Sequence, residues 1–271
     1  MFKNLRLKII EKIIKKLFFL YFYFRYTKNY NLDLYIKKQE EKFSNFNLNR
    51  FNGKKKFDDL KKSFTFLNSE MNSEHQTIFC SLSEKKNISI TKILEIGTHD
   101  GKNAFLLSKL FPNALIETMD LEDDNEIFNE TYSRNDKKFK EKFIDERNKI
   151  LLKYKNIKFI QKNSLSLLFE NHKKYNLIWI DGSHSYPVVT IDIVNALNLI
   201  DDGGVILCDD IFTQSIGENN IYRSNAGYET LTELKNANII SFTLFYKRLN
   251  KSFNAIPKER KFIAYITKNK F

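Results

Sequence analysis

Acidic residues and one histidine follow two apolar stretches in the second half of the chain. His184 stands three positions after Asp181, and Asp209 is followed at once by Asp210. Clustered carboxylates repel one another, and a divalent cation such as Mg²⁺ relieves that repulsion because it prefers oxygen ligands. An imidazole can take a proton from a hydroxyl group near neutral pH. The four side chains therefore predict activation of a hydroxyl group as a nucleophile, provided that the fold brings them together.

A glycine-containing loop lies upstream, in the pattern E-x-G-x-x-x-G formed by Glu95, Gly97 and Gly101. Glycine lets a backbone turn tightly and approach a ligand closely. Asp120 follows 23 positions after Gly97. A carboxylate at the tip of the next strand can accept both ribose hydroxyls of a nucleoside. Because the spacing G-x-G-x-x-G of dinucleotide-binding loops is absent, the loop favours a nucleoside cofactor and disfavours a nicotinamide oxidoreductase.

Both groups of residues require a parallel sheet, because the carboxyl ends of parallel strands meet at one edge. Short apolar runs predict five buried strands, at 93–96, 115–119, 157–160, 177–180 and 205–208. Segments that can form crossover helices lie between them, at 102–111, 137–153, 164–173 and 187–199. Two β-rich stretches, 239–247 and 261–267, predict an antiparallel pair that closes the sheet. The predicted fold class is α/β, a doubly wound, Rossmann-like and mostly parallel sheet of seven strands.

The N-terminal part of the chain predicts an extension outside this sheet. Apolar residues of segment 3–26 recur at helical spacing with lysines on the other faces, which predicts an amphipathic helix. Residues 29–56 are rich in Asn and Lys and weakly periodic, which predicts a linker with short helical pieces. We therefore expect a basic extension and linker at 1–56 and the α/β domain at 57–271. The first segment of that domain, 57–84, is expected to form a helix over the sheet edge.

The basic character of the chain is local. The net charge is +12, and residues 1–60 hold 15 Lys and Arg against 6 Asp and Glu. Such an arm can meet nucleic acid, anionic lipid or an acidic protein. The longest apolar run, 17–24, is too short to span a bilayer, and no small-residue cleavage site follows it. Segment 3–26 can therefore dock on the domain, contact a second copy, or lie on the inner membrane surface.

Cysteine usage favours a reducing compartment. The two cysteines, Cys80 and Cys208, are far apart in the sequence, and neither lies in a Cys/His cluster. This disfavours a disulfide framework and a structural zinc site. We expect a cytoplasmic protein.

Four stretches of sequence resemble a known family. They read LEIGTHDGKNAFLL from residue 94, MDLED from 119, LIWIDGSHSYPVVTIDI from 177 and LIDDGGVILCDDI from 199. Together they resemble class I S-adenosylmethionine-dependent methyltransferases, and in particular the bacterial small-molecule O-methyltransferases that include macrolide-sugar O-methyltransferases. The resemblance runs from about residue 91 to residue 210 and leaves the N-terminal part outside it.

The resemblance implies S-adenosylmethionine as the cofactor. It implies that Glu95 holds the methionine amino group, that Gly97 and Gly101 shape the loop, and that Asp120 binds the ribose. The family often has an acidic residue near the adenine, and this chain has the pair Asn163-Ser164 there, whose amide and hydroxyl can still bond the adenine amine.

The resemblance also implies roles at the other two strand ends. Related metal-dependent enzymes use acidic residues at these positions, which implies Asp181, Asp209 and Asp210 as ligands of Mg²⁺, with Asp181 also near the cofactor. Where catechol-type enzymes have Asn, this chain has Asp210, as in the sugar-modifying branch. In that branch a histidine three positions after the fourth-strand Asp serves as the base, and His184 occupies that position.

These observations predict a metal-assisted O-methyltransferase that acts on a hydroxylated small molecule such as a sugar or glycan precursor. Substrate contacts are expected from segment 211–230, with Tyr222 and Arg223 facing the substrate. The N/D-P-P-Y tetrapeptide of amino-directed nucleic-acid methyltransferases is absent, so a nucleic-acid partner is disfavoured. Two alternatives stay open, an RNA methyltransferase that uses the basic arm and a non-catalytic, membrane-associated nucleotide-binding protein.

Overall fold

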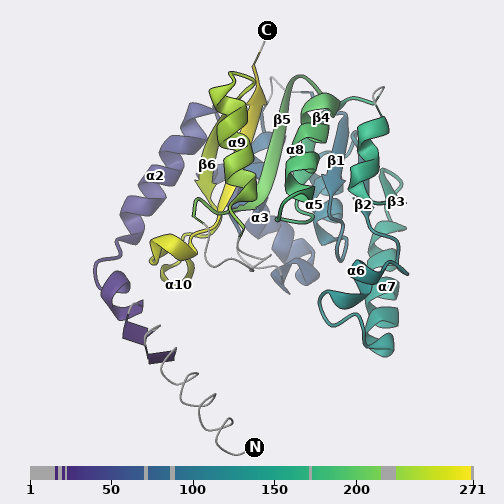
Figure 1. The fold of residues 1–271 in the computed structure, drawn as a ribbon, viewed down its shortest axis with the longest axis horizontal. Coiled ribbons are helices and arrows are strands. Elements are labelled where there is room, and N and C mark those ends of the chain that lie inside the picture. The colour runs from purple at the N-terminus through teal and green to yellow at the C-terminus, as the bar shows by residue number, and fades with distance from the viewer. Residues whose placement is uncertain are drawn as a thin grey trace, which may run out of the picture.

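The computed structural model describes residues 16–17, 20–21, 23–69, 73–85, 89–170, 173–214 and 224–269. Seven strands form one sheet in the order β3-β2-β1-β4-β5-β7-β6 (Figure 1). The strands are β1 (Lys92–Ile96), β2 (Leu115–Asp120), β3 (Ile157–Gln161), β4 (Tyr175–Ile180), β5 (Ile200–Ile211), β6 (Ile240–Tyr246) and β7 (Phe262–Lys268). The pairings among β1 to β5 are parallel, while β7 runs antiparallel to both β5 and β6. The predicted seven-stranded Rossmann-like sheet is therefore confirmed.

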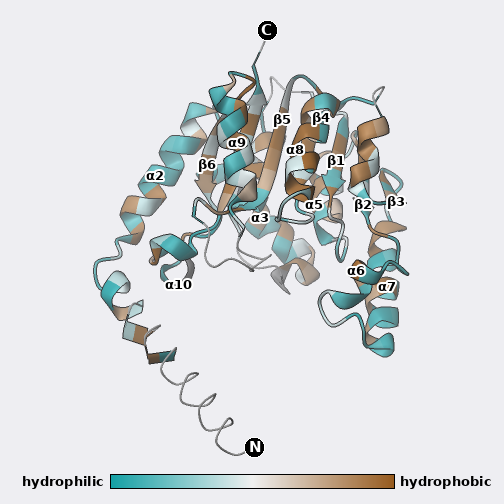
Figure 2. Cartoon of the chain, in the orientation of Figure 1, coloured by the Kyte–Doolittle hydropathy of each residue, from teal (hydrophilic) through white to brown (hydrophobic). Residues whose placement is uncertain are grey.

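Alternation along the central strands divides the core into two layers, because successive side chains of a strand point to opposite faces. On β4, Leu177 and Trp179 join the cluster that packs under α4 (Glu74–Ser83) and α5 (Lys102–Leu110). Ile178 and Ile180 join the cluster under α8 (Val188–Leu199) and α9 (Ala226–Asn236). Figure 2 shows the central strands and α8 as apolar and the outward faces of α2, α7 and α9 as mainly polar.

The connections between the parallel strands agree with the predicted helices, except that one segment forms a 3₁₀ helix. Helices α5, α7 (Lys137–Leu151) and α8 lie within the ranges expected for crossovers. Segment 164–173 was expected to be an α-helix, and the structure has the short 3₁₀ helix η2 (Ser164–Phe169) instead. Its N-cap residue Asn163 accepts a hydrogen bond from the backbone of Leu165 at 3.0 Å. Asn163 therefore caps only a short helix, and short helical pieces often take the tighter 3₁₀ form.

The region expected to be a linker is largely helical. It holds α2 (Leu32–Asn45) and the start of α3 (Arg50–Ser63), each with an asparagine as its N-cap. Asn31 accepts from the backbone of Leu34 and Asn49 from that of Asn52. The asparagines that suggested a linker therefore begin helices, which is the role that their short polar side chains favour.

Helices α2 and α3 pack on the domain. Phe43 of α2 is fully buried in the same cluster as Phe57 of α3 and Phe105 of α5. Gln39 of α2 pairs with the edge strand β6, because its side chain donates to the carbonyl of Tyr246 at 3.1 Å and accepts from the Tyr246 N–H at 2.9 Å. This pairing satisfies part of an otherwise open sheet edge.

Two further N-terminal expectations meet the structure only in part. The helix expected over 57–84 is divided into the end of α3, the 3₁₀ helix η1 (Thr65–Ser69) and α4. The expected boundary between residues 56 and 57 falls inside α3.

Most of segment 3–26 lies outside the described residues, and residues 23–27 are helical. Among the described residues, no helix has the length and apolar content needed to cross a membrane.

Candidate active site

The loop after β1 passes close to the end of β4. Gly97 has φ of 102°, a left-handed conformation that favours glycine, and its N–H donates to the carbonyl of Met119 at 2.9 Å. A Cβ on Gly97 would lie 2.2 Å from the carbonyl oxygen of Asp181. The absence of a side chain on Gly97 therefore lets the loop after β1 and the end of β4 approach each other closely.

The second glycine of the loop positions α5. Gly101 has φ of 78° and precedes the first helical residue, Lys102. A Cβ there would lie 2.9 Å from the side chain of Leu151, near the end of α7. Gly101 thus allows α5 to begin tightly after the loop and to pack against α7.

Glu95 lies beneath the loop rather than on its surface. Its side chain is fully buried and accepts hydrogen bonds from Asn103 at 2.8 Å and from the Thr118 hydroxyl at 2.5 Å. Thr118 lies 2.7 Å from the hydroxyl of Thr98, which belongs to the loop itself. Burial raises the pKa of Glu95 to about 7, although both hydrogen bonds act to lower it. Glu95 therefore ties the loop and α5 to β2 in this structure.

Asp120 ends β2 and faces the same loop. One carboxylate oxygen accepts from the His99 N–H at 2.8 Å, and the other accepts from the Leu121 N–H at 2.9 Å. Asp120 is only partly buried, so a ligand can still reach it. The next strand end lies beside it, because the Lys162 N–H donates to the Asp120 carbonyl at 2.8 Å and Asn163 follows directly. The predicted ribose and adenine positions are therefore neighbours.

A bulge at the end of β5 brings Asp209 and Asp210 to the same place. Consecutive residues of a regular strand point to opposite faces, which would separate the two carboxylates. The β5–β7 register shifts between Cys208 and Ile211, and Asp210 has φ of 52°. A bulge of this kind re-aims side chains next to functional sites. Both carboxylates consequently bond to the same side chain, that of Lys247.

Two lysines neutralise this pair of carboxylates. Lys247 donates to Asp209 and, at 2.5 Å, to Asp210, while Lys261 donates to the second oxygen of Asp210. Burial alone would lower the pKa of Lys247, but the charges of Asp209 and Asp210 outweigh it and raise that pKa. Burial would likewise raise the pKa of Asp210, and the two lysines with His184 lower it instead. Both oxygens of Asp210 and one oxygen of Asp209 therefore bond to a lysine side chain.

The expected Mg²⁺ site does not fit this arrangement. Asp181, Asp209 and Asp210 do converge, as their strand ends predicted, but ammonium groups hold both oxygens of Asp210 and one of Asp209. The Asp209 side chain is only 2% exposed, which leaves little access for an ion that keeps several waters. Across the described part of the chain, no group of three His, Cys, Asp or Glu side chains is arranged to hold a metal ion.

His184 lies at the open side of this cluster. Its Nε2 is 3.7 Å from a carboxylate oxygen of Asp181 and 3.7 Å from one of Asp210. Burial lowers its pKa below the usual 6.5, although the charges of Asp210 and Asp209 oppose that shift. A neutral imidazole near two carboxylates can accept a proton and be stabilised afterwards as a cation.

Asp181 lies between the loop after β1 and the pair of Asp209 and Asp210. Its pKa is raised by burial and by the negative charge of Asp209. About a third of the Asp181 side chain stays exposed, so it belongs to the surface that a ligand would meet.

Sequence reasoning missed three residues of this site. Lys247 and Lys261 are the last and first residues of the two predicted β-rich stretches, and no local pattern marks them. His75 lies against Trp179, with ring centroids 5.1 Å apart and ring planes tilted by 38°. Burial lowers its pKa to about 4, which fits a neutral wall residue. A search for basic residues at the predicted carboxyl edge of the sheet would have flagged the two lysines.

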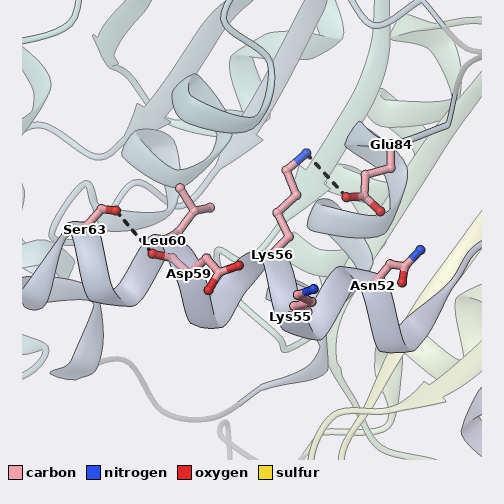
Figure 3. A pocket seen from close by; sticks show the side chains of 7 residues that line it. All are labelled: Asn52, Lys55, Lys56, Asp59, Leu60, Ser63 and Glu84. Carbon is pink, nitrogen blue, oxygen red and sulfur yellow. Dashed lines mark hydrogen bonds and ion pairs between the residues drawn. The ribbon is translucent and has the colours of Figure 1, made fainter.

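Other features lie away from the strand ends. A groove of about 470 Å³ runs along α3, lined by Lys56, Asp59, Glu84 and four neighbouring residues (Figure 3). None of the predicted site residues lines it. Tyr222 and Arg223, expected to contact the substrate, lie outside the described residues.

Comparisons with known proteins agree with this geometry. A family model described as "Methyltransferase domain" matches residues 94–211, which span every loop from β1 to the end of β5. No curated protein shows a significant match to the sequence.

Three solved structures are similar to this chain at low sequence identity. A Staphylococcus aureus protein assigned as a caffeoyl-CoA O-methyltransferase is 15% identical, with a TM-score of 0.54 over 81% of this chain and 100% of that one. A Klebsiella pneumoniae protein assigned as an O-methyltransferase is 14% identical, with a TM-score of 0.49 over 71% and 77%. A Bacillus cereus O-methyltransferase in complex with SAH is 17% identical, with a TM-score of 0.47 over 66% and 74%.

The family match and the site coincide. The matched segment contains the loop around Gly97, the predicted ribose-binding position at Asp120, and the strand ends that carry Asp181 and His184. Over residues 94–211 this chain matches a methyltransferase domain, which supports a class I S-adenosylmethionine-dependent methyltransferase.

Proposed function

We propose that this enzyme transfers the methyl group of S-adenosylmethionine to a hydroxyl oxygen of a small molecule, with His184 as the general base. The observation that carries the proposal is the close approach of the Gly97 loop to the end of β4, which joins the cofactor loop to the cluster of Asp181 and His184. The methyl donor and the acceptor hydroxyl would meet at that junction.

The cofactor half of the site rests on three contacts. S-adenosylmethionine supplies an electrophilic methyl group on a sulfonium. Asp120 would accept the ribose hydroxyls, and the pair Asn163-Ser164, which follows Lys162 beside Asp120, would contact the adenine. Asp181 faces the junction from β4, where a carboxylate favours a positively charged ligand. Glu95, buried under the loop, would act by holding the loop in shape rather than by touching the methionine group.

The acceptor half of the site needs a base. An aliphatic hydroxyl is a weak nucleophile until its proton is removed. His184 is neutral at physiological pH because burial lowers its pKa, so it can take that proton as the oxygen forms its bond to the methyl carbon. The bond between the methyl carbon and the sulfonium sulfur would break in the same step, and S-adenosylhomocysteine would leave as the neutral thioether. Asp181 and Asp210, each 3.7 Å from Nε2, would stabilise the imidazolium that results.

The acceptor class follows from the polarity of the site. The side chains of Asp181 and His184 are 35% and 20% exposed and offer hydrogen-bonding groups that suit a polyhydroxylated molecule such as a sugar or glycan precursor. The carboxylates of this site do not fit a divalent cation, so the proposed reaction includes no metal ion.

Calorimetric titration of S-adenosylmethionine into the purified chain, with and without Mg²⁺, tests the cofactor half. Saturable binding that is weakened in Asp120→Ala supports the proposal. Transfer of a radiolabelled methyl group to a panel of hydroxylated acceptors tests the other half. Absence of cofactor binding would overturn the proposal and favour a non-catalytic binding protein.

We also propose that the N-terminal helix contacts anionic lipid at the cytoplasmic membrane surface or a second copy of the chain. Leu17 and Phe24 expose 59% and 67% of their surface, next to the cations Lys16 and Arg25. Exposed apolar side chains beside cations are typical of interfacial helices. Flotation with vesicles that contain phosphatidylserine, compared with vesicles of pure phosphatidylcholine, tests the contact with anionic lipid. Gel filtration of the full chain tests the contact with a second copy.

A further inference from the structure

We propose that Lys247 and Lys261 replace a divalent cation in this methyltransferase, so that methyl transfer proceeds without a metal ion. The inference rests on the proposed function and concerns its acceptor site. Lys247 is a positioning residue in this scheme, because its side chain is only 9% exposed and acts through the carboxylates. Lys261 is 28% exposed and lies nearer the ligand surface.

The antiparallel end of the sheet delivers these lysines. Strand β7 begins at the edge where β5 ends, since Ile211 pairs with Phe262. Strand β6 ends at the same edge, since Tyr246 pairs with Phe262. Lys247 and Lys261 are therefore the residues just beyond the paired ends, and the Lys247 N–H donates to the Lys261 carbonyl at 2.9 Å. Both side chains consequently start from the carboxyl edge of the parallel strands.

The charges of the cluster are balanced by the chain itself. Lys247 bridges Asp209 and Asp210, and Lys261 takes the remaining oxygen of Asp210. Three of the four carboxylate oxygens of Asp209 and Asp210 are therefore bonded to ammonium groups of the chain itself. These ammonium groups stand where a divalent cation would otherwise bind the carboxylates.

This arrangement changes what the acceptor must provide. A metal ion that orients an acceptor is most effective when two adjacent oxygens chelate it. Lysines that are already bonded to carboxylates make no such demand, so an acceptor with a single hydroxyl group can be methylated. His184 would still take the proton of that hydroxyl.

Mn²⁺ titration followed by electron paramagnetic resonance tests the proposal without any acceptor. The wild-type chain should show no saturable Mn²⁺ binding below about 1 mM. Lys247→Met frees one oxygen on each of Asp209 and Asp210 and should gain binding. Lys261→Gln, at a partly exposed position, frees one Asp210 oxygen and serves as a second variant that is easier to fold. Lys158→Gln, which removes one of the two lysines beside Glu117 on the far side of the sheet, is the matched control and should gain none.

Activity in EDTA completes the test. Wild-type methyl transfer should change less than about twofold in EDTA, whereas a metal-assisted enzyme would lose about 100-fold or more. Tight Mn²⁺ binding by the wild-type chain, loss of its activity in EDTA, or failure of both lysine variants to gain Mn²⁺ binding would overturn the proposal. Cofactor titration is read separately, so a failure of S-adenosylmethionine binding would identify the proposed function, and not the lysine cluster, as wrong.

Discussion

A side chain on Gly97 would collide with the backbone of Asp181, because its Cβ would lie 2.2 Å from the carbonyl oxygen and 2.6 Å from the carbonyl carbon. The two residues belong to different strand ends, the first after β1 and the second after β4. Their contact sets the distance between the cofactor loop and the acceptor cluster. A backbone neighbour cannot rotate away as a flexible side chain can, so the contact makes glycine a requirement at this position.

We predict that Gly97→Ala is more destabilising than Gly203→Ala. Both glycines have positive φ, 102° and 75°, so alanine is strained at either position. A Cβ at Gly203 meets no atom within 4 Å, which isolates the strain from the collision. We expect Gly97→Ala to lower the free energy of unfolding by about 2–3 kcal/mol more than Gly203→Ala in urea titrations. Equal losses in the two variants would contradict the collision.

We predict that Asp120→Ala weakens S-adenosylmethionine binding by about 10- to 100-fold, because hydrogen bonds to a charged group contribute about 1.5–3 kcal/mol. Asp120→Asn keeps one acceptor oxygen and should lose less. Glu122→Ala, an exposed residue two positions further on, is the control and should bind as the wild-type chain does. Calorimetric titration measures all three affinities, and unchanged binding by Asp120→Ala would remove the ribose contact from the scheme.

We predict that His184→Ala lowers the rate of methyl transfer by about 10²- to 10⁴-fold and leaves cofactor affinity unchanged. The wild-type rate should fall as the pH drops below the usual histidine pKa of 6.5, since burial moves the pKa of His184 downward. The variant should lack this acidic fall in rate. A variant with normal turnover, or a wild-type rate that falls already above pH 6.5, would assign the base to another group.

We predict that Glu95→Gln changes how the stability of the protein depends on pH. Burial raises the pKa of Glu95 from 4.5 to about 7, so the folded state keeps a proton that the unfolded chain loses above pH 4.5. The free energy of unfolding therefore falls as the pH rises from about 4.5 to about 7, by about 3 kcal/mol at most. Glutamine is neutral throughout, so the variant should gain stability relative to wild type between pH 5 and pH 8.

Urea unfolding at both pH values measures this difference. Glu122→Gln, at an exposed position, provides the control for a change of charge alone and should track the wild-type chain. If the curves of Glu95→Gln and wild type run parallel across the range, Glu95 does not hold an extra proton in the folded state.

The local parts of this site could be predicted because their signals lie within a few residues. The runs before Gly97, Asp120 and Asp181 are apolar, and each proved to be a strand of the parallel sheet. His184 could be placed near Asp181 because only three positions separate them. The N-terminal region could not be predicted in the same way. Asn31 and Asn49 suggest a linker when composition is considered alone, and only their capping bonds show that they begin α2 and α3.

The charge balance of the site was decided by tertiary structure. The sequence by itself determined that three carboxylates would gather at one sheet edge, and repulsion among them then suggested a metal ion. Lys247 and Lys261 stand 37 and 51 positions from Asp210, and no local pattern links them to it. They meet Asp210 because β7 runs antiparallel to both β5 and β6, so that β6 ends and β7 begins at the carboxyl edge where β5 ends. Hydrophobic periodicity predicts each strand, but the cation that a carboxylate finds depends on which strand ends lie beside it.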